Sequence, residues 1–289
     1  MNLPAILAET GPATRSERHS TIVLIADETS ARTAQSGALS AMRDSGHALC
    51  LFEGRTDSPW LLDELRQYLE RHRPLGAIVL PPLSAVPGLA YLCEDMDCIP
   101  VRLSPCGLAG EARTLCSNDR LAAADATQYL IALGHRRIGL ICGSETCLAS
   151  RACELGFIDA LAAHELDRGA ELVATCDGSF AAGEEASRLL LEISPRPSAI
   201  LTSSDVLAAS VLKVAQALGI AVPGALSIVG FGDTPLAAML PTALTSVRLP
   251  DSEMAFAAAI ELIGTSQTPQ PAEFFGTLVP RASSGPAAQ

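Results

Sequence analysis

The feature that most constrains the fold is a repeated alternation of short apolar runs with longer helical segments. Residues 21–27 (TIVLIAD) are too few and too rich in β-branched side chains for a helix, and 31–46 then has helical spacing. Strands that are apolar along their whole length predict parallel sheets covered by helices on both faces. The expected strands are 21–27, 47–53, 76–82, 98–103, 112–118, 136–143, 170–176, 197–205 and 226–233. Because these units are too many for one compact sheet, we expect an α/β fold of two Rossmann-like subdomains.

Composition limits the classes of partner. The 289 residues carry a formal net charge of −12, and an acidic surface repels phosphate backbones, so the chain alone is predicted to be a poor nucleic-acid binder. The N-terminal residues have no basic segment followed by a long apolar one, and no run reaches 18 uninterrupted apolar residues. We therefore expect a cytoplasmic protein without a membrane partner.

Signatures of catalysis and of metal binding are weak. Nine cysteines include no C-x-x-C pair, and their spacing does not match zinc ligands, so we expect reduced, mostly buried thiols. The run at 230–233 (GFGD) holds a lone G-x-G, which does not make a dinucleotide fingerprint. No G-x-S-x-G, H-E-x-x-H or P-loop pattern is present. We expect no metal and no cofactor, and an enzyme remains only a third alternative.

Polar residues at strand ends point instead to binding. Asp27, Ser204, Asp205 and Asp233 each follow an apolar strand, and the carboxyl ends of parallel strands form the edge at which open α/β sheets bind ligands. Such carboxylates can accept hydrogen bonds from sugar or amide donors. Asp205 also has a simpler interpretation, as the N-cap of the helix expected at 206–219.

Several linked motifs resemble a known family. QYLIALGHRRIGLICG, LGFIDAL, PSAILTSSDVLAASVLKVAQALGIAVPGALSIVGFGD, PTALTSVRLPDSEMAFAAAIELI and the ending LVPRASS resemble, in order and spacing, the effector-binding core of LacI/GalR-type transcriptional regulators. The resemblance runs from about residue 21 to 284. It implies the two-lobed type I periplasmic-binding-protein fold, with a small effector, sugar-like or nucleobase-like, bound in a cleft between the lobes. It also implies a homodimer in which lobe closure is coupled to operator binding.

The same resemblance implies a domain organisation. We expect a linker or hinge remnant at 1–20, an N-terminal lobe from 21–133 plus 248–268, a C-terminal lobe from 134–247 plus 272–281, and a flexible tail at 282–289. The family's helix-turn-helix head precedes its first strand, and only twenty residues do so here. Operator DNA is therefore expected as a partner only if such a head is supplied.

The effector anchors depart from the family pattern. The carboxylate that usually follows the strand is replaced by Gly232, which leaves Asp233, and the usual arginine is replaced by Cys153, with Arg151 two residues earlier. Phe180 is the nearest candidate for stacking on a sugar. Either the ligand is more apolar and contacts Cys153, or Arg151 and Asp233 act as substitute anchors, or ligand control has been lost. The runner-up function is a solute-binding protein of a transport system with the same fold.

Overall fold

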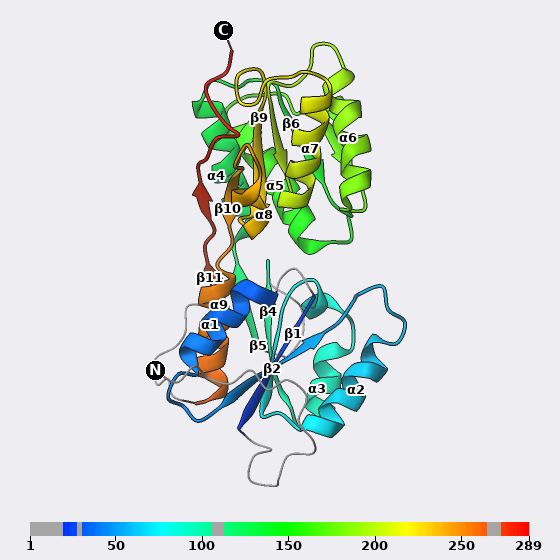
Figure 1. Ribbon diagram of the computed structural model, residues 1–289, viewed down its shortest axis with the longest axis vertical. Helices are drawn as coiled ribbons and strands as arrows, with labels where there is room; N and C mark the ends of the chain where they lie inside the picture. The colour runs from blue at the N-terminus through cyan, green and yellow to red at the C-terminus, as the bar shows by residue number, and fades with distance from the viewer. Residues whose placement is uncertain (1–19, 28–30, 106–112, 265–272, 289) are drawn as a thin grey trace. The chain divides into compact units, whose positions relative to one another are not determined.

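The computed structural model describes residues 20–27, 31–105, 113–264 and 273–288. The chain divides into two compact units (Figure 1). Unit 1 comprises 1–117 and 250–274, and unit 2 comprises 118–249 and 275–289. The expected linker at 1–20 lies, except for Ser20, outside the described residues.

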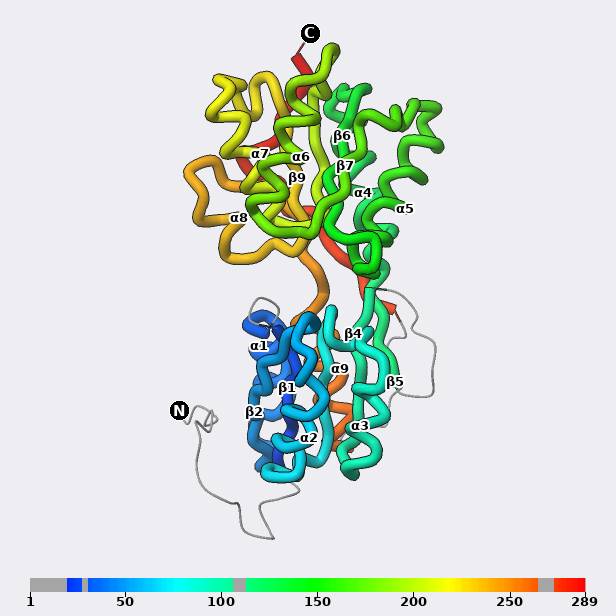
Figure 2. The backbone as a smooth tube through the Cα atoms, turned by 90° about the vertical axis from the view of Figure 1, so that its right-hand side faces the viewer, coloured from blue at the N-terminus to red at the C-terminus, as the bar shows by residue number. Residues whose placement is uncertain are grey.

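Unit 1 is built on a six-stranded parallel sheet in the order β11-β5-β4-β3-β1-β2. Its strands are β1 (Thr21–Ala26), β2 (Ala48–Glu53), β3 (Gly76–Val79), β4 (Ile99–Ser104), β5 (Arg113–Ser117) and β11 (Glu273–Phe274). Helices α1 (Ala31–Ala41) and α9 (Asp251–Leu262) cover one face, and α2 (Leu61–His72) and α3 (Leu89–Asp95) cover the other, as Figures 1 and 2 both show. A short 3-10 helix, η1 (Leu83–Ala85), follows β3.

The alternation of side chains along each strand of unit 1 supplies both faces of its core. In β1, Ile22 and Leu24 pack under α1 and α9, whereas Val23 and Ile25 pack under α2 and α3. Helices α1 and α9 approach closely at Gly37, where a Cβ would overlap the backbone of Ser252. The absence of a side chain at this position is what allows the contact.

Unit 2 has a second six-stranded sheet, in the order β12-β10-β9-β8-β6-β7, in which only the β10–β12 pair is antiparallel. Its strands are β6 (Ile138–Cys142), β7 (Val173–Thr175), β8 (Ala199–Thr202), β9 (Ser227–Gly232), β10 (Thr245–Arg248) and β12 (Thr277–Val279). Helices α4 (Asp119–Ala132) and α5 (Leu148–Ala163) cover one face, and α6 (Phe180–Glu192) and α7 (Asp205–Ala217) cover the other. The 3-10 helix η2 (Ala170–Leu172) precedes β7, and α8 (Pro235–Met239) follows β9.

The first boundary between the units differs from the one expected from the sequence. It falls at 117/118 rather than at 133/134, so α4 belongs to unit 2. The physical reason is that α4 buries its apolar face in the core that α5, β6 and β8 share. Gly156 of α5 fits against the backbone of Arg120 in α4, where a Cβ would clash.

The C-terminal residues also differ from expectation, because the predicted flexible tail at 282–289 is held by contacts as far as Ala287, whose amide donates to the Leu133 carbonyl at 2.9 Å. Ser283 is fully buried, and its hydroxyl donates to the Ile228 carbonyl at 2.6 Å. The imidazole of His135, 2% exposed, lies 2.8 Å from Ser198 Oγ and 3.1 Å from the Gly285 carbonyl oxygen. Because a carbonyl only accepts, Nε2 carries the proton and Nδ1 accepts from Ser198. These contacts hold the segment against β9.

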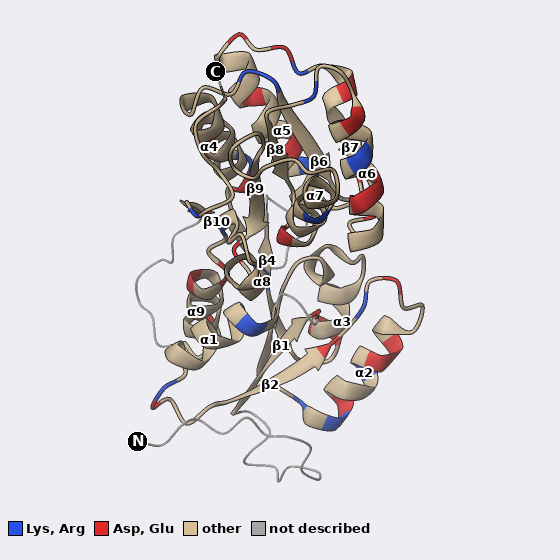
Figure 3. Cartoon of the chain, turned by 45° about the horizontal axis from the view of Figure 1, so that its top comes forward, with Lys and Arg blue, Asp and Glu red and all other residues tan. Residues whose placement is uncertain are grey.

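Acidic and basic side chains occur together on α2 in unit 1 and on α6 in unit 2 (Figure 3). Within the described ranges, none of the helices combines the length and apolar character that a bilayer span requires. The same part of the chain holds no cluster of three or more His, Cys, Asp or Glu side chains placed to bind a metal.

Candidate functional site

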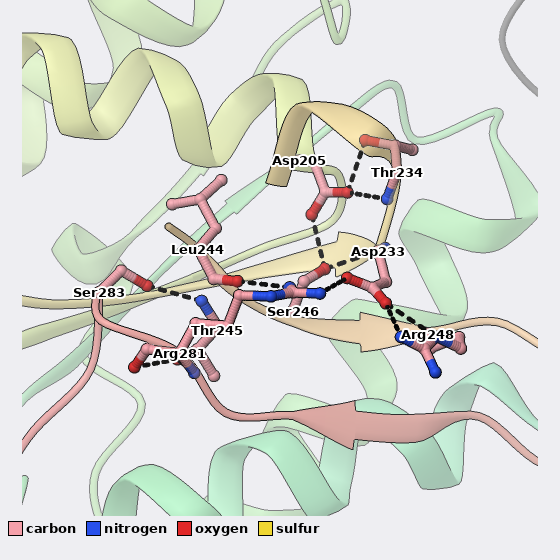
Figure 4. Close-up of polar contacts among 9 residues, drawn as sticks. All are labelled: Asp205, Asp233, Thr234, Leu244, Thr245, Ser246, Arg248, Arg281 and Ser283. Atoms are coloured by element: carbon pink, nitrogen blue, oxygen red, sulfur yellow. Dashed lines mark hydrogen bonds and ion pairs between the residues drawn. The ribbon is translucent and has the colours of Figure 1, made fainter. Parts of the chain in front are cut away.

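A polar cluster lies where β8 and β9 of unit 2 end (Figure 4). Asp205 is the first residue of α7, and its side chain is buried, with the residue 2% exposed. The helix cap is instead Ser204, whose hydroxyl accepts from the Leu207 amide at 3.3 Å. Ser204 therefore performs the capping role that the sequence suggested for Asp205, and the carboxylate of Asp205 is directed elsewhere.

Asp205 connects the start of α7 to two other segments. Its Oδ2 accepts from the amide and the hydroxyl of Thr234 at 2.6 and 2.8 Å, and its Oδ1 accepts from the hydroxyl of Ser246 at 2.6 Å. Burial raises the pKa of Asp205, while the hydrogen bonds from Ser246 and Thr234 act in the opposite direction. The carboxylate thus fixes the turn after β9 and the middle of β10 relative to α7.

Asp233 is the second buried carboxylate, and two arginines surround it. Arg248 Nε donates to Oδ2 at 2.8 Å and Arg248 Nη2 lies 2.6 Å from the same oxygen. Arg281 Nη2 lies 2.6 Å from Oδ1, as an ion pair without hydrogen-bond alignment. The Asp233 side chain is 3% exposed, against 20% for Arg281 and 59% for Arg248.

The backbone of this turn explains the glycine that precedes Asp233. Gly232 has a φ of +119°, a region that side chains rarely adopt, and Asp233 follows at +46°. A Cβ at Gly232 would lie 3.7 Å from Asp205 Oδ2. A carboxylate at position 232 would therefore be strained and would face a second carboxylate.

Two of the residues that engage Asp233 were not among the predicted site residues. Arg248 and Arg281 end the runs TSVR and LVPR, and each is a single charge at the end of an otherwise uncharged run, within or just after a strand. Such a charge beside a strand-end carboxylate is the signal that could have identified them. With both arginines in place, the charge of the Asp233 carboxylate is already balanced within the protein, although its Oδ1 has no aligned hydrogen-bond donor.

The other predicted anchors of unit 2 lie apart from this cluster. Cys153 is 0% exposed, in the core between α4, α5 and the sheet, where contact with the Cys142 thiol and burial raise its pKa. Arg151 is exposed, and no ion pair to it is found among the described residues. It lines a cavity of about 240 Å³ whose other walls are Cys142, Gly143, Glu145, Ser150, Glu154 and Thr175. A ligand in that cavity would meet Arg151, whereas Cys153 is covered.

Phe180 and Asp27 complete the predicted set. Phe180 begins α6 and is 38% exposed, but Lys213 Nζ lies 5.2 Å from its ring centroid and also pairs with Glu184 at 2.8 Å. One face of the ring is thus taken by a cation. Asp27 follows β1 in unit 1 and is half-buried. The structure therefore brings Ser204, Asp205, Gly232 and Asp233 together, and places Arg151, Cys153 and Phe180 elsewhere in unit 2.

Comparison with known proteins identifies a family that this chain matches. Residues 127–284 match the model of a periplasmic binding protein-like domain. The chain is 32% identical over 223 residues to the HTH-type transcriptional regulator GalR of Salmonella typhimurium, a match that covers 75% of this chain and 64% of that regulator. It is 32% identical over 157 residues to the repressor CytR of Escherichia coli, covering 54% of this chain and 46% of CytR.

Solved structures give the same result. The transcriptional regulator CelR in complex with cellobiose aligns with a TM-score of 0.79 at 25% identity, over 92% of this chain and 85% of that one. A LacI family transcriptional regulator from Mycobacterium smegmatis aligns with a TM-score of 0.79 over 92% of this chain and 100% of that one, and at 24% identity it supports the fold alone.

Proposed function

Because the chain belongs to the periplasmic binding protein-like domain family, in the form found in LacI/GalR-type transcriptional regulators, we propose that it is the ligand-sensing part of such a regulator. The observation that carries the proposal is the similarity to GalR, a regulator, over three quarters of this chain. The chain spans 64% of the length of GalR, so operator binding is proposed for the whole protein, through a helix-turn-helix head.

The mechanism is a coupling between ligand and DNA. A small effector that prefers one arrangement of the two units shifts the population towards it, and operator affinity changes by the same free energy. We propose that the protein acts as a homodimer in the cytoplasm. Binding of the effector between the units stays a prediction.

The geometry of the polar cluster in unit 2 disfavours proton-transfer chemistry. Both buried carboxylates of the polar cluster already accept hydrogen bonds or ion pairs from protein groups, Asp205 from Thr234 and Ser246, and Asp233 from its two arginines. A general acid or base must instead be free to exchange a proton with a substrate. The curated relatives named above are regulators as well, which disfavours both the transport protein and the enzyme.

The anchors of unit 2 also bear on the effector. A charge-assisted hydrogen bond contributes about 1.5–3 kcal/mol, so loss of the usual arginine and carboxylate lowers affinity for a simple sugar by about 10² to 10⁴. Asp233 is a poorer substitute for the lost carboxylate than a free one, because Arg248 and Arg281 already pair with it. We therefore expect weak or undetectable binding of common monosaccharides and purines in calorimetry.

The proposal is tested by genome-wide mapping of the DNA bound by the complete protein, epitope-tagged in its native gene. Enrichment of a few discrete sequences, which purified complete protein then binds selectively at physiological salt, is the expected result. A folded, expressed protein that enriches no sequence above an untagged control would contradict the regulator function.

A further inference from the structure

Arg102 places a positive charge on an otherwise apolar face of unit 1. In β4, Val101 and Leu103 point into the core under α1 and α9, so Arg102 points to the opposite face. Its neighbours in register are Val79 of β3, which belongs to the core under α2 and α3, and Thr114 of β5. The side chain therefore leaves the sheet beside apolar packing.

Two nitrogens of the Arg102 guanidinium lack a hydrogen-bond partner among the described residues. Its Nε and Nη2 atoms are buried, and neither makes a hydrogen bond within the described part of the chain. No ion pair to this side chain is found there either. Arg102 as a whole is half-buried, and its guanidinium stays charged at any physiological pH, so the two buried N–H groups without a partner cost free energy.

A second largely buried arginine of the same chain shows the contrast. Arg281 has the Asp233 carboxylate at 2.6 Å and donates to the Leu244 carbonyl at 2.7 Å. The fold thus supplies a counter-charge where an arginine is structural. At Arg102 two buried donors have no partner among the described residues, and such donors in a native protein call for one.

The position of Arg102 identifies the kind of partner. β4 ends at Ser104, two residues further along, and two strand residues span roughly 7 Å. The guanidinium therefore lies near the carboxyl edge of a parallel sheet, the edge at which open α/β sheets bind small ligands. The short helix η1 packs against β4 and carries Ser84, which is 3% exposed and whose hydroxyl makes no hydrogen bond to a described residue.

We propose that Arg102 binds the anionic group, a carboxylate or a phosphate, of the small-molecule effector. The proposal rests on the ligand-sensing function above and names its ligand class. The planar fork of an arginine matches the two oxygens of such a group, and a charge-assisted pair is about twice as strong as a neutral hydrogen bond. Unit 2 offers a neutral polyol no unoccupied carboxylate in its polar cluster, whereas unit 1 offers an anion an unpaired cation.

The experiment measures thermal unfolding and calorimetric binding of the purified chain at constant ionic strength, in chloride alone and with inorganic phosphate, citrate, gluconate, glucose 6-phosphate or glucose. We expect either the phosphate-bearing or the carboxylate-bearing probes to stabilise the chain saturably, and the class that does so identifies the anionic group. Glucose, which is neutral, should not stabilise it. Arg102→Met should weaken binding of the stabilising probe by about 10- to 100-fold, as the loss of one charge-assisted pair predicts. Arg43→Met, which removes an exposed arginine from unit 1 that belongs to no site described above, is the matched control and should keep the response.

A second measurement does not depend on the choice of probe. In chloride alone, Arg102→Met should unfold at the same temperature as the unmodified chain or at a higher one, because it removes two buried donors that have no partner among the described residues. A lower unfolding temperature would show that the protein itself pairs Arg102, and would overturn the proposal. So would equal stabilisation of both proteins by the anions, or no stabilisation by any of them. The DNA-mapping experiment is unaffected by these outcomes, so a failed anion site and a failed regulator function are distinguishable.

Discussion

The two arginines that engage Asp233 should differ strongly in their contribution to stability. Arg281→Met removes a largely buried guanidinium, its hydrogen bond to the Leu244 carbonyl and its ion pair with a carboxylate that is 3% exposed. Breaking a buried pair costs about 3–5 kcal/mol, and because Arg248 still contacts the carboxylate we expect about 2–4 kcal/mol. Arg248→Met removes a side chain that is 59% exposed, and water can replace it at Oδ2, so we expect at most about 1 kcal/mol.

The assay is urea unfolding followed by circular dichroism, with amide hydrogen exchange of β9, β10 and β12 to assign the loss to unit 2. The Asp233→Ala substitution tests the pairing itself. It should cost less in the Arg281→Met background than in the unmodified chain, because the shared interaction is already gone. An Arg248→Met variant as destabilised as Arg281→Met, or additive costs for Asp233→Ala and Arg281→Met, would refute the assignment of the buried pair to Arg281.

Three further outcomes are expected from the packing. Asp205→Ala should lower the free energy of unfolding by about 2–4 kcal/mol, because it leaves the buried donors of Thr234 and Ser246 unpaired. Asp205→Asn keeps an acceptor and should cost less. Equal losses for the two variants in urea unfolding would contradict this. Burial lowers the pKa of His135 in the folded chain, so the neutral imidazole contributes its full stability above the unfolded pKa of about 6.5. This contribution is lost as the pH falls from about 6.5 towards the folded pKa. The midpoint of urea unfolding should therefore drop over that pH range, and it should drop less in His135→Gln. Gly37→Ala should cost about 1–3 kcal/mol through its clash in α9, while Gly224→Ala, where the added methyl meets only a side chain at 3.7 Å, should be near neutral in thermal unfolding.

The sequence predicted the elements of this fold better than the contacts among its polar residues. Apolar runs such as 21–27 and 226–233 are local signals, because burial on both faces requires continuous hydrophobicity. The partners of Asp205 are not local: Thr234 and Ser246 follow it by 29 and 41 residues, and only the order of strands in the sheet brings them together. The two-residue strand β11 also escaped prediction, because a pair of residues carries no periodicity.

One physical reason applies to both altered anchors of unit 2, Cys153 and Gly232: a charged side chain at either position would destabilise the fold. Cys153 completes an apolar core at 0% exposure, and an arginine there would have to leave that core past Cys142 or remain buried without a partner. Gly232 adopts a φ that a side chain would strain, beside the carboxylate of Asp205. Neither position accepts the usual charged anchor without cost to the fold, and the remaining carboxylate, Asp233, is neutralised within the protein. We therefore expect a ligand that binds this chain with useful affinity to obtain a charged contact elsewhere. The guanidinium of Arg102, whose Nε and Nη2 have no hydrogen-bond partner among the described residues, is where unit 1 offers one.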